Sequence, residues 1–177
     1  MKLAAIGYDA GQGDGVDAML RAVAHDLMAQ GYKLAGAVQW NEARQGQQHD
    51  AMILEDLATG IRLDVSGHLG EGANGCRLDS YALETVAGIV ANTIDRDVDL
   101  VILNRFGKQE VARAGFRPII EAAVANELPV LTGLNNAFRP FWEAFTSGEG
   151  VYLAPKREDI QAWAVRALTP RKAAAAL

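Results

Sequence analysis

Short apolar runs alternate along the chain with stripes of apolar residues at helical spacing. Residues 3–7 and 99–103 are the clearest runs, and each predicts a buried strand. Val16 and Leu27 lie on one stripe, which predicts a helix that ends at Gly31. Because strands alternate with helices, the pattern predicts an α/β fold in which helices cover both faces of a mostly parallel sheet.

The same pattern predicts the remaining elements and the limits of the domain. Residues 51–57 and 61–65 flank a turn at 58–60, which predicts a small antiparallel β-hairpin. A single domain is expected over residues 1–168, followed by a flexible tail over 169–177. Further strands are expected at 33–40, 129–132 and 151–153, and further helices at 79–95, from 118, at 137–145 and at 156–168.

Composition narrows the class of protein. The 177 residues are 50% hydrophobic and 22% charged, as in a folded domain with a sizeable core. No apolar run is long enough to span a membrane, and the N-terminus lacks the pattern of a signal peptide. Cys76 is the single cysteine, which excludes an internal disulfide and favours a cytoplasmic protein. A net charge of -5 without a basic run argues against nucleic acid and anionic membranes as partners.

A glycine-rich segment, residues 8–15, joins the first strand to the first helix. In parallel sheets, ligands bind beyond the carboxyl ends of the strands, and glycines let backbone N–H groups approach an anion there. Gly11, Gln12 and Gly13 resemble the turn of a P-loop, which continues with lysine and then serine or threonine. Here Asp14 takes the place of the lysine and Gly15 that of the hydroxyl residue. The segment is therefore a candidate nucleotide or anion site without its usual cation.

The carboxylates of this segment admit other interpretations. Asp14 is as well placed to cap the helix, with Asp17 in an acidic first turn. Alternatively, Asp9, Asp14 and Asp17 together could bind a cation such as Mg²⁺, which prefers oxygen ligands. Asp9 and Asp14 are the candidate metal ligands.

A second candidate segment, residues 104–110, follows the strand predicted at 99–103. Asn104 stands where a Walker B element has an acid that holds Mg²⁺. Arg105, Lys108 and Arg117 give the region a local positive charge that suits phosphate or another oxyanion. The alternatives are a solvated basic loop, or arginine–glutamate pairs in the interface of a homo-oligomer.

Cys76 lies just before the helix predicted at 79–95. A helix N-terminus and the neighbouring Arg77 would lower the pKa of its thiol, which makes it a candidate reactive thiol. A small buried thiol without chemistry is the more common situation.

Five stretches of the chain resemble a known family. They are residues 8–14, 76–79, 104–110, 115–117 and 129–132, the third being Asn-Arg-Phe-Gly-Lys-Gln-Glu. The sequence looks like a bacterial family of domains of unknown function, number 2478, over nearly its whole length. Genes of that family often lie beside molybdate-transport genes, so the resemblance implies a link to molybdenum handling.

The chain is also distantly similar to small P-loop nucleoside triphosphatases, which implies a three-layer α/β domain with a small β-hairpin insertion. In those proteins an apolar strand is followed by Asp-Glu, an apolar residue and Gly-Lys-Met-Glu. Asn104 and Arg105 replace the two acids here. Counting the lysine and the hydroxyl of the first segment, four catalytic groups are changed. Because each such group typically contributes about 10²–10³ in rate, efficient hydrolysis of ATP is not expected.

Three functional hypotheses follow. The first is a protein that binds a nucleotide or an oxyanion such as molybdate, with Mg²⁺ accompanying the nucleotide. The second is a divergent phosphohydrolase in which Arg105 or Lys108 replaces the lysine. The third is a non-catalytic interaction module. Whether the protein is an enzyme is left open by the sequence.

Overall fold

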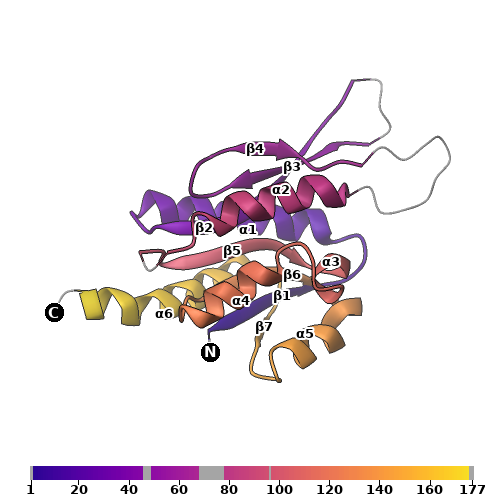
Figure 1. Ribbon diagram of the computed structural model, residues 1–177. Helices are drawn as coiled ribbons and strands as arrows, with labels where there is room; N and C mark the ends of the chain where they lie inside the picture. The colour runs from indigo at the N-terminus through magenta and orange to yellow at the C-terminus, as the bar shows by residue number, and fades with distance from the viewer. Residues whose placement is uncertain (1, 46–48, 68–77, 96, 176–177) are drawn as a thin grey trace.

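The computed structural model describes residues 2–45, 49–67, 78–95 and 97–175 (Figure 1). Strands and helices alternate over most of this range, as the apolar pattern predicts. The elements are β1 (Leu3–Tyr8), α1 (Gly13–Ala29), β2 (Leu34–Glu42), β3 (Ala51–Asp56), β4 (Arg62–Asp64), α2 (Ser80–Ala91), β5 (Leu100–Phe106), α3 (Lys108–Val111), α4 (Arg117–Ala125), β6 (Val130–Asn135), the 3₁₀ helix η1 (Asn136–Phe138), α5 (Arg139–Phe145), β7 (Val151–Leu153) and α6 (Arg157–Ala175).

The strands form one seven-stranded sheet in the order β4-β3-β2-β5-β6-β1-β7. From β2 to β7 all neighbours are parallel, whereas β3 and β4 extend the sheet in antiparallel fashion beside β2. The predicted parallel sheet and β-hairpin are therefore confirmed. Within this order β1 and β5 are separated by β6 alone, so the segments that follow β1 and β5 lie at the same edge of the sheet.

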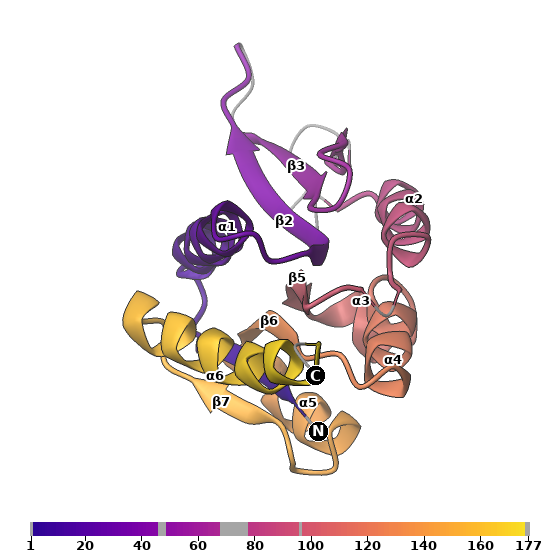
Figure 2. The same ribbon diagram turned by 90° about the vertical axis from the view of Figure 1, so that its left-hand side faces the viewer.

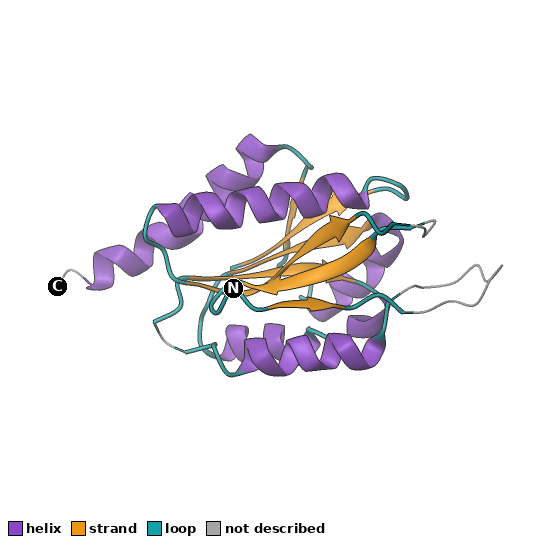
Figure 3. Cartoon of the chain, turned by 90° about the horizontal axis from the view of Figure 1, so that it is seen from above, coloured by secondary structure: helices purple, strands orange, loops and turns teal. Residues whose placement is uncertain are grey.

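Helices cover both faces of the sheet, which gives the three layers visible in Figure 3. α1 and α6 lie on one face, and α2, α4 and α5 lie on the other (Figure 2). Each face has its own apolar core. Leu20 of α1 and Ile160 of α6 belong to the first, and Val86 of α2 and Ile120 of α4 belong to the second. Burial of these helical stripes against the sheet is the main source of stability.

The central strand β5 is longer than the sequence pattern indicates. It continues to Phe106, so Asn104 and Arg105 belong to the strand and not to the loop expected at 104–110. The ladder with β6 shifts register between Leu103 and Arg105 and then resumes with Arg105 opposite Gly133. Phe106 anchors the extension because its buried ring packs edge-on against Trp142. Lys108 then begins the short helix α3.

The last helix is also longer than expected. α6 runs to Ala175, so the backbone of residues 169–175 is helical and not the loose tail that was predicted. Alanine has the highest intrinsic helix propensity, and the alanine-rich sequence after residue 172 extends the helix. None of the helices in the described parts of the chain combines the length and apolar character needed to cross a membrane.

A substitution at Gly36 would test the close contact between β2 and β5. Gly36 has φ +114°, and a methyl group on its Cα would lie 1.9 Å from the backbone oxygen of Ile102. We expect Gly36→Ala to lower the free energy of unfolding by about 3 kcal/mol or more, because backbone strain and overpacking add. Urea denaturation would measure the loss. Gly60→Ala is the matched control, since Gly60 has φ +72° but open space around it. Its expected cost is about 1 kcal/mol, and equal losses for the two variants would contradict the argument.

Candidate functional site

A partly buried ion pair joins the helix that follows the first candidate segment to the second candidate segment. Arg105 on β5 donates from Nε and Nη2 to the two carboxylate oxygens of Asp17 on α1, at 3.1 and 2.5 Å. The Asp17 side chain is 1% exposed, whereas that of Arg105 is 35% exposed. Since a guanidinium stays protonated, it presents these N–H groups to the carboxylate in fork geometry.

The environment of this pair acts on the pKa of both partners. Burial raises the pKa of Asp17, and the hydrogen bonds and charge of Arg105 oppose that rise. Burial alone would lower the pKa of Arg105, but the bond to Asp17 and its charge outweigh burial and raise that pKa. Asp17 was interpreted from the sequence as a residue of an acidic first turn. The structure corrects this, because α1 begins at Gly13, so that Asp17 lies beyond the first turn, and its buried carboxylate reaches Arg105 on β5.

Arg105 also lies against the start of α1. A methyl group on Gly13 would lie 2.9 Å from its Nη2 atom, so the guanidinium would have to shift to admit a larger residue there. The carboxylate of Asp14 is 4.0 Å from the same nitrogen and 86% exposed. Arg105 thus brings a cation to a glycine-rich turn that lacks the lysine of a P-loop.

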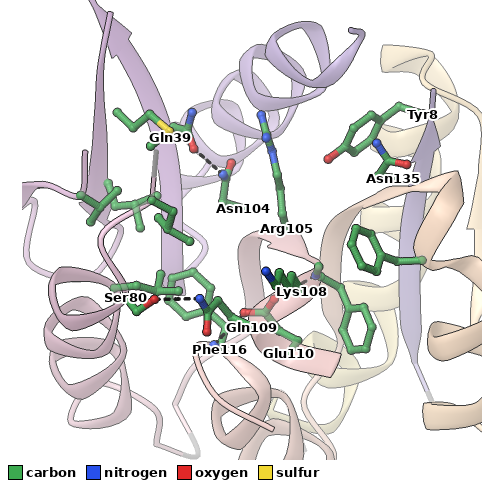
Figure 4. Close-up of a pocket in the computed structure, with 18 residues that line it drawn as sticks. Tyr8, Gln39, Ser80, Asn104, Arg105, Lys108, Gln109, Glu110, Phe116 and Asn135 are labelled. Carbon is green, nitrogen blue, oxygen red and sulfur yellow. Dashed lines mark hydrogen bonds between the residues drawn. The ribbon is translucent and has the colours of Figure 1, made fainter. Parts of the chain in front are cut away.

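A cavity of about 680 Å³ opens beyond the carboxyl ends of β1, β5 and β6 (Figure 4). This is the edge at which parallel sheets bind ligands. Its polar side chains come from those strands, from β2 and from α3, and its apolar wall comes from β3, α2 and their neighbours. The lining consists of Tyr8, Gln39, Met52, Leu54, Val65, Leu78, Ser80, Leu83, Asn104, Arg105, Phe106, Gly107, Lys108, Gln109, Glu110, Phe116, Asn135 and Phe138.

Asn104 is the most unusual residue of the lining. It is 5% exposed, and its Nδ2 donates to Oε1 of Gln39 at 2.8 Å (Figure 4). Its Oδ1 is buried and has no hydrogen-bond partner among the described residues. A buried acceptor without a donor costs roughly 1–3 kcal/mol, so such atoms are uncommon outside functional sites.

Tyr8 and Lys108 supply further polar groups. Burial raises the pKa of Tyr8, which keeps its hydroxyl protonated and able to donate to a ligand. Lys108 is exposed at the start of α3 and forms no ion pair with the described residues. Together with Arg105 it makes the polar side of the cavity cationic.

The Glu110 side chain binds the backbone on both sides of α3. Its side chain is buried and accepts hydrogen bonds from the backbone N–H groups of Gly107 and Phe116, at 2.8 and 3.0 Å. Burial raises the pKa of Glu110, and these hydrogen bonds oppose the rise only in part. The carboxylate therefore stabilises the loop that positions Lys108, at an electrostatic cost that increases when it ionises.

The remaining candidates lie away from the cavity. None of the residues from Gly11 to Gly15 lines it, and Gln12 instead accepts a hydrogen bond from the backbone of Asp9. Arg117 pairs with Glu121 at 2.9 Å and stacks over Phe145. It borders a smaller hollow of about 260 Å³ on the α4–α5 side.

The structure does not gather the three carboxylates of the first segment around one point. Asp9 accepts a hydrogen bond from Asn136, Asp14 accepts one from Asn41, and Asp17 is paired with Arg105. Nor does Asp14 cap α1, which begins at Gly13 and has no side-chain cap. Within the described ranges, no group of three or more His, Cys, Asp or Glu side chains is arranged to hold a metal ion. Cys76, the candidate thiol, lies outside the described residues.

The sequence did not single out three further residues of the cavity, Tyr8, Gln39 and Glu110. Gln39, the partner of Asn104, lies in a predicted strand but was not singled out. Tyr8 was read only as the first residue of a loop, and Glu110 only as part of a motif. Polarity was the available signal for Gln39, since an amide inside an apolar strand needs a buried partner.

The fold and site define the class of protein. A mostly parallel sheet between two helical layers, with a glycine-rich turn leading from β1 into α1, is an α/β domain of the P-loop nucleoside-triphosphatase type. The chain belongs to the family described as protein of unknown function (DUF2478), whose model matches residues 3–163. The resemblance seen in the sequence is therefore confirmed.

A curated relative carries a functional name. The molybdenum import ATP-binding protein ModC 2 of Bradyrhizobium diazoefficiens is 37% identical over 150 residues, which are 85% of this chain. The chain spans 17% of the length of that protein. No solved structure matches the chain.

The ion pair can be tested by a double-mutant cycle. Arg105→Leu leaves the buried carboxylate of Asp17 without a cation, so we expect a loss of about 3 kcal/mol in the free energy of unfolding. Asp17→Leu should cost less, because the guanidinium that it leaves unpaired is partly exposed. The double variant should recover much of the loss, since it buries no unpaired charge. Additive losses, measured by urea denaturation, would show that the two side chains are not coupled.

Glu110 makes stability depend on pH. Because its folded-state pKa is raised above that of the unfolded chain, its contribution is fully present below the unfolded pKa of about 4.3 and is lost as pH rises through the folded pKa. We therefore expect the free energy of unfolding of the wild type to fall relative to that of Glu110→Gln as the pH rises from 4. Chemical denaturation at several pH values would measure it, and parallel profiles for the two proteins would contradict the burial argument.

Proposed function

We propose that this domain binds a small anionic ligand of the nucleotide class in the cavity beside β5, and holds it without efficient hydrolysis. The observation that carries the proposal is the set of residues that line this cavity. One side offers the cations Arg105 and Lys108, and the other is apolar, with Leu83 and Phe116 among its residues. A ligand that is charged at one end and has a flat or apolar body matches both sides.

The size of the cavity favours a nucleotide over a bare oxyanion. Its volume of about 680 Å³ lies within the usual range for organic ligands, roughly 300–1,000 Å³. An oxyanion would contact Lys108 and Arg105 but would leave the apolar wall uncovered. A base or similar ring could lie against Leu83 and Phe116 while phosphates reach the cations.

Arg105 supports binding at the position of the missing P-loop lysine. Its guanidinium lies between Gly13 and the cavity, and Asp17 fixes its orientation through two hydrogen bonds. The pair with Asp17 neutralises much of its charge, so Arg105 contributes mainly N–H donors in a fixed position. Lys108, which forms no ion pair with a described residue, contributes the full charge.

The same residues argue against efficient hydrolysis. The end of β5 presents the neutral Asn104 where an acid would hold magnesium. Glu110 is the carboxylate of the lining, and two backbone N–H groups already occupy it. A group held in that way is poorly placed to activate water.

Molybdate is the second candidate ligand. It is favoured by the name of the relative from Bradyrhizobium diazoefficiens, a molybdenum import ATP-binding protein, and by the cationic side of the cavity. For that oxyanion Lys108, Arg105 and the Tyr8 hydroxyl would be the contacts. A role in molybdenum handling and a role in nucleotide binding are compatible, because the relative's name includes both.

Thermal unfolding with ATP, GTP and molybdate, each with and without Mg²⁺, tests the proposal. A ligand at a hundredfold excess over its Kd stabilises the folded state by about 2.7 kcal/mol. Lys108→Ala should weaken binding about tenfold, the usual effect of losing a charge-assisted contact. Lys156→Ala, which removes an exposed lysine outside the cavity lining, should leave affinity unchanged. Absence of any shift with all three compounds would overturn ligand binding and favour an interaction module.

A further inference from the structure

Three neighbouring strands end in side chains whose hydrogen-bond donors are not all used. Tyr8 is the last residue of β1, Asn135 is the last residue of β6, and Arg105 is the last but one of β5. The three strands are neighbours in the sheet, in the order β5-β6-β1. All three residues line the cavity (Figure 4). We call Tyr8, Asn135 and Arg105 the donor set.

The register of the strands brings the donor set together on the face of the sheet that α1 covers. Tyr8 and Asn135 are opposite each other in the ladder of β1 and β6, and Arg105 is opposite Gly133, two residues before Asn135. A methyl group on Gly133 would lie 3.2 Å from Cγ1 of Val16 on α1 and 3.6 Å from Cε1 of Tyr8. No side chain at Gly133 separates Tyr8 from Arg105, whose guanidinium carbon lies 5.8 Å from the centre of the Tyr8 ring.

The hydrogen bonds already formed determine which atom of each residue is left. Oδ1 of Asn135 accepts from the backbone N–H of Ala137 at 2.9 Å, so the free end of this amide is its NH₂ group. Arg105 uses Nε and Nη2 for Asp17, which leaves Nη1. The hydroxyl of Tyr8 forms no hydrogen bond with a described residue, and burial raises its pKa, so it remains able to donate.

The free atoms of the donor set are accessible. Within the described parts of the chain, buried side-chain nitrogen or oxygen atoms without a partner occur at three other residues and at none of the donor set. Tyr8 Oη, Asn135 Nδ2 and Arg105 Nη1 lack partners there as well, so each must have solvent-accessible surface. In Figure 4 the hydroxyl of Tyr8 points toward the side of the cavity where Arg105 lies, and Asn135 is beside Tyr8. A ligand in the cavity can therefore reach these donors without breaking a hydrogen bond of the protein.

The donor set matches an oxyanion better than it matches a base or a sugar. A fully ionised phosphate or molybdate presents several acceptor oxygens and no donor, whereas an N–H or O–H of a base or sugar would meet further donors. Neighbouring strands lie about 4.8 Å apart, so donors from three of them can surround one tetrahedral group. Asp17 offsets the charge of Arg105, so the donor set supplies directed hydrogen bonds, and Lys108 supplies the additional charge.

We infer that the donor set binds the oxyanion group of the ligand at the ends of β1, β6 and β5, and that Asn135 makes this subsite specific for a group that only accepts hydrogen bonds. The inference rests on the proposed function and deepens it. It assigns the phosphate end of a nucleotide to the α1 side of the cavity, and leaves the apolar wall to the base.

Asn135→Asp tests the inference with little change of shape. The aspartate keeps an oxygen for the N–H of Ala137 but replaces the free NH₂ group with a charged acceptor. In calorimetric titrations without Mg²⁺, which the new carboxylate could bind, we expect the affinity for ATP to fall at least about tenfold. The affinity for adenosine, which has no phosphate, should change less than about twofold. An unchanged affinity for ATP, or equal losses for ATP and adenosine, would overturn the inference.

A matched control separates the subsite from the overall charge of the protein. Asn92→Asp makes the same charge change at an exposed position outside the cavity lining, and should leave the affinity for ATP unchanged. If Asn92→Asp weakens ATP as much as Asn135→Asp does, the specific role of Asn135 is wrong.

Tyr8→Phe removes a second donor and keeps the ring. Because the hydroxyl has no partner among the described residues, the free energy of unfolding should not fall, whereas the affinity for ATP should fall about tenfold. An affinity for ATP equal to that of the wild type would contradict the placement of the oxyanion at these strand ends.

Inorganic phosphate and molybdate, each titrated alone, separate the inference from the proposed function. If ATP binds wild type and Asn135→Asp equally, the inference fails and the proposed function stands. If ATP does not bind, but phosphate or molybdate binds wild type at least about tenfold more tightly than Asn135→Asp, the nucleotide proposal fails and the donor set stands. If none of the compounds binds, both fail.

Discussion

The ion pair between Asp17 and Arg105 is the constraint on which the site depends. It joins α1 to β5 across 88 positions of sequence. A buried pair of this kind adds little net stability, but breaking it is costly because one charge is left uncompensated. Its effect is therefore on geometry. It fixes the guanidinium beside Gly13 and fixes the end of β5 relative to the glycine-rich turn.

This constraint explains how the chain tolerates a cation at a helix N-terminus. The first turn of α1 has the positive end of the helix dipole, where a guanidinium alone would be disfavoured. Asp17 balances Arg105 directly, and Asp14 lies 4.0 Å from the same nitrogen. In a P-loop the phosphate supplies the negative charge and lysine the positive one. Here the protein itself supplies both charges, so Arg105 is balanced by Asp17 and Asp14 without a ligand.

Local patterns predicted the fold well, whereas the site needed contacts that local patterns do not contain. The helical stripes of α1 and α2 and the apolar runs of β1 and β5 are visible in the sequence because burial imposes their spacing. Asn104, Arg105 and Lys108 were singled out from the sequence as candidate nucleotide- or anion-binding residues, and all three line the cavity. The pairing of Asp17 with Arg105 and that of Gln39 with Asn104 were not predicted, because contacts between distant segments leave no periodic signal.

The loss of the P-loop lysine and the pairing of Arg105 are parts of one arrangement. With lysine at position 14, a second cation would stand beside the guanidinium, in place of a carboxylate that lies 4.0 Å from it. With aspartate the turn loses its usual cation, and the guanidinium of Arg105 lies beside Gly13, where Asp17 holds it by two hydrogen bonds. The cation that a P-loop carries on the turn is therefore carried here by β5, whose end lines the cavity. For this reason the proposed ligand site lies beside β5 and not at the turn.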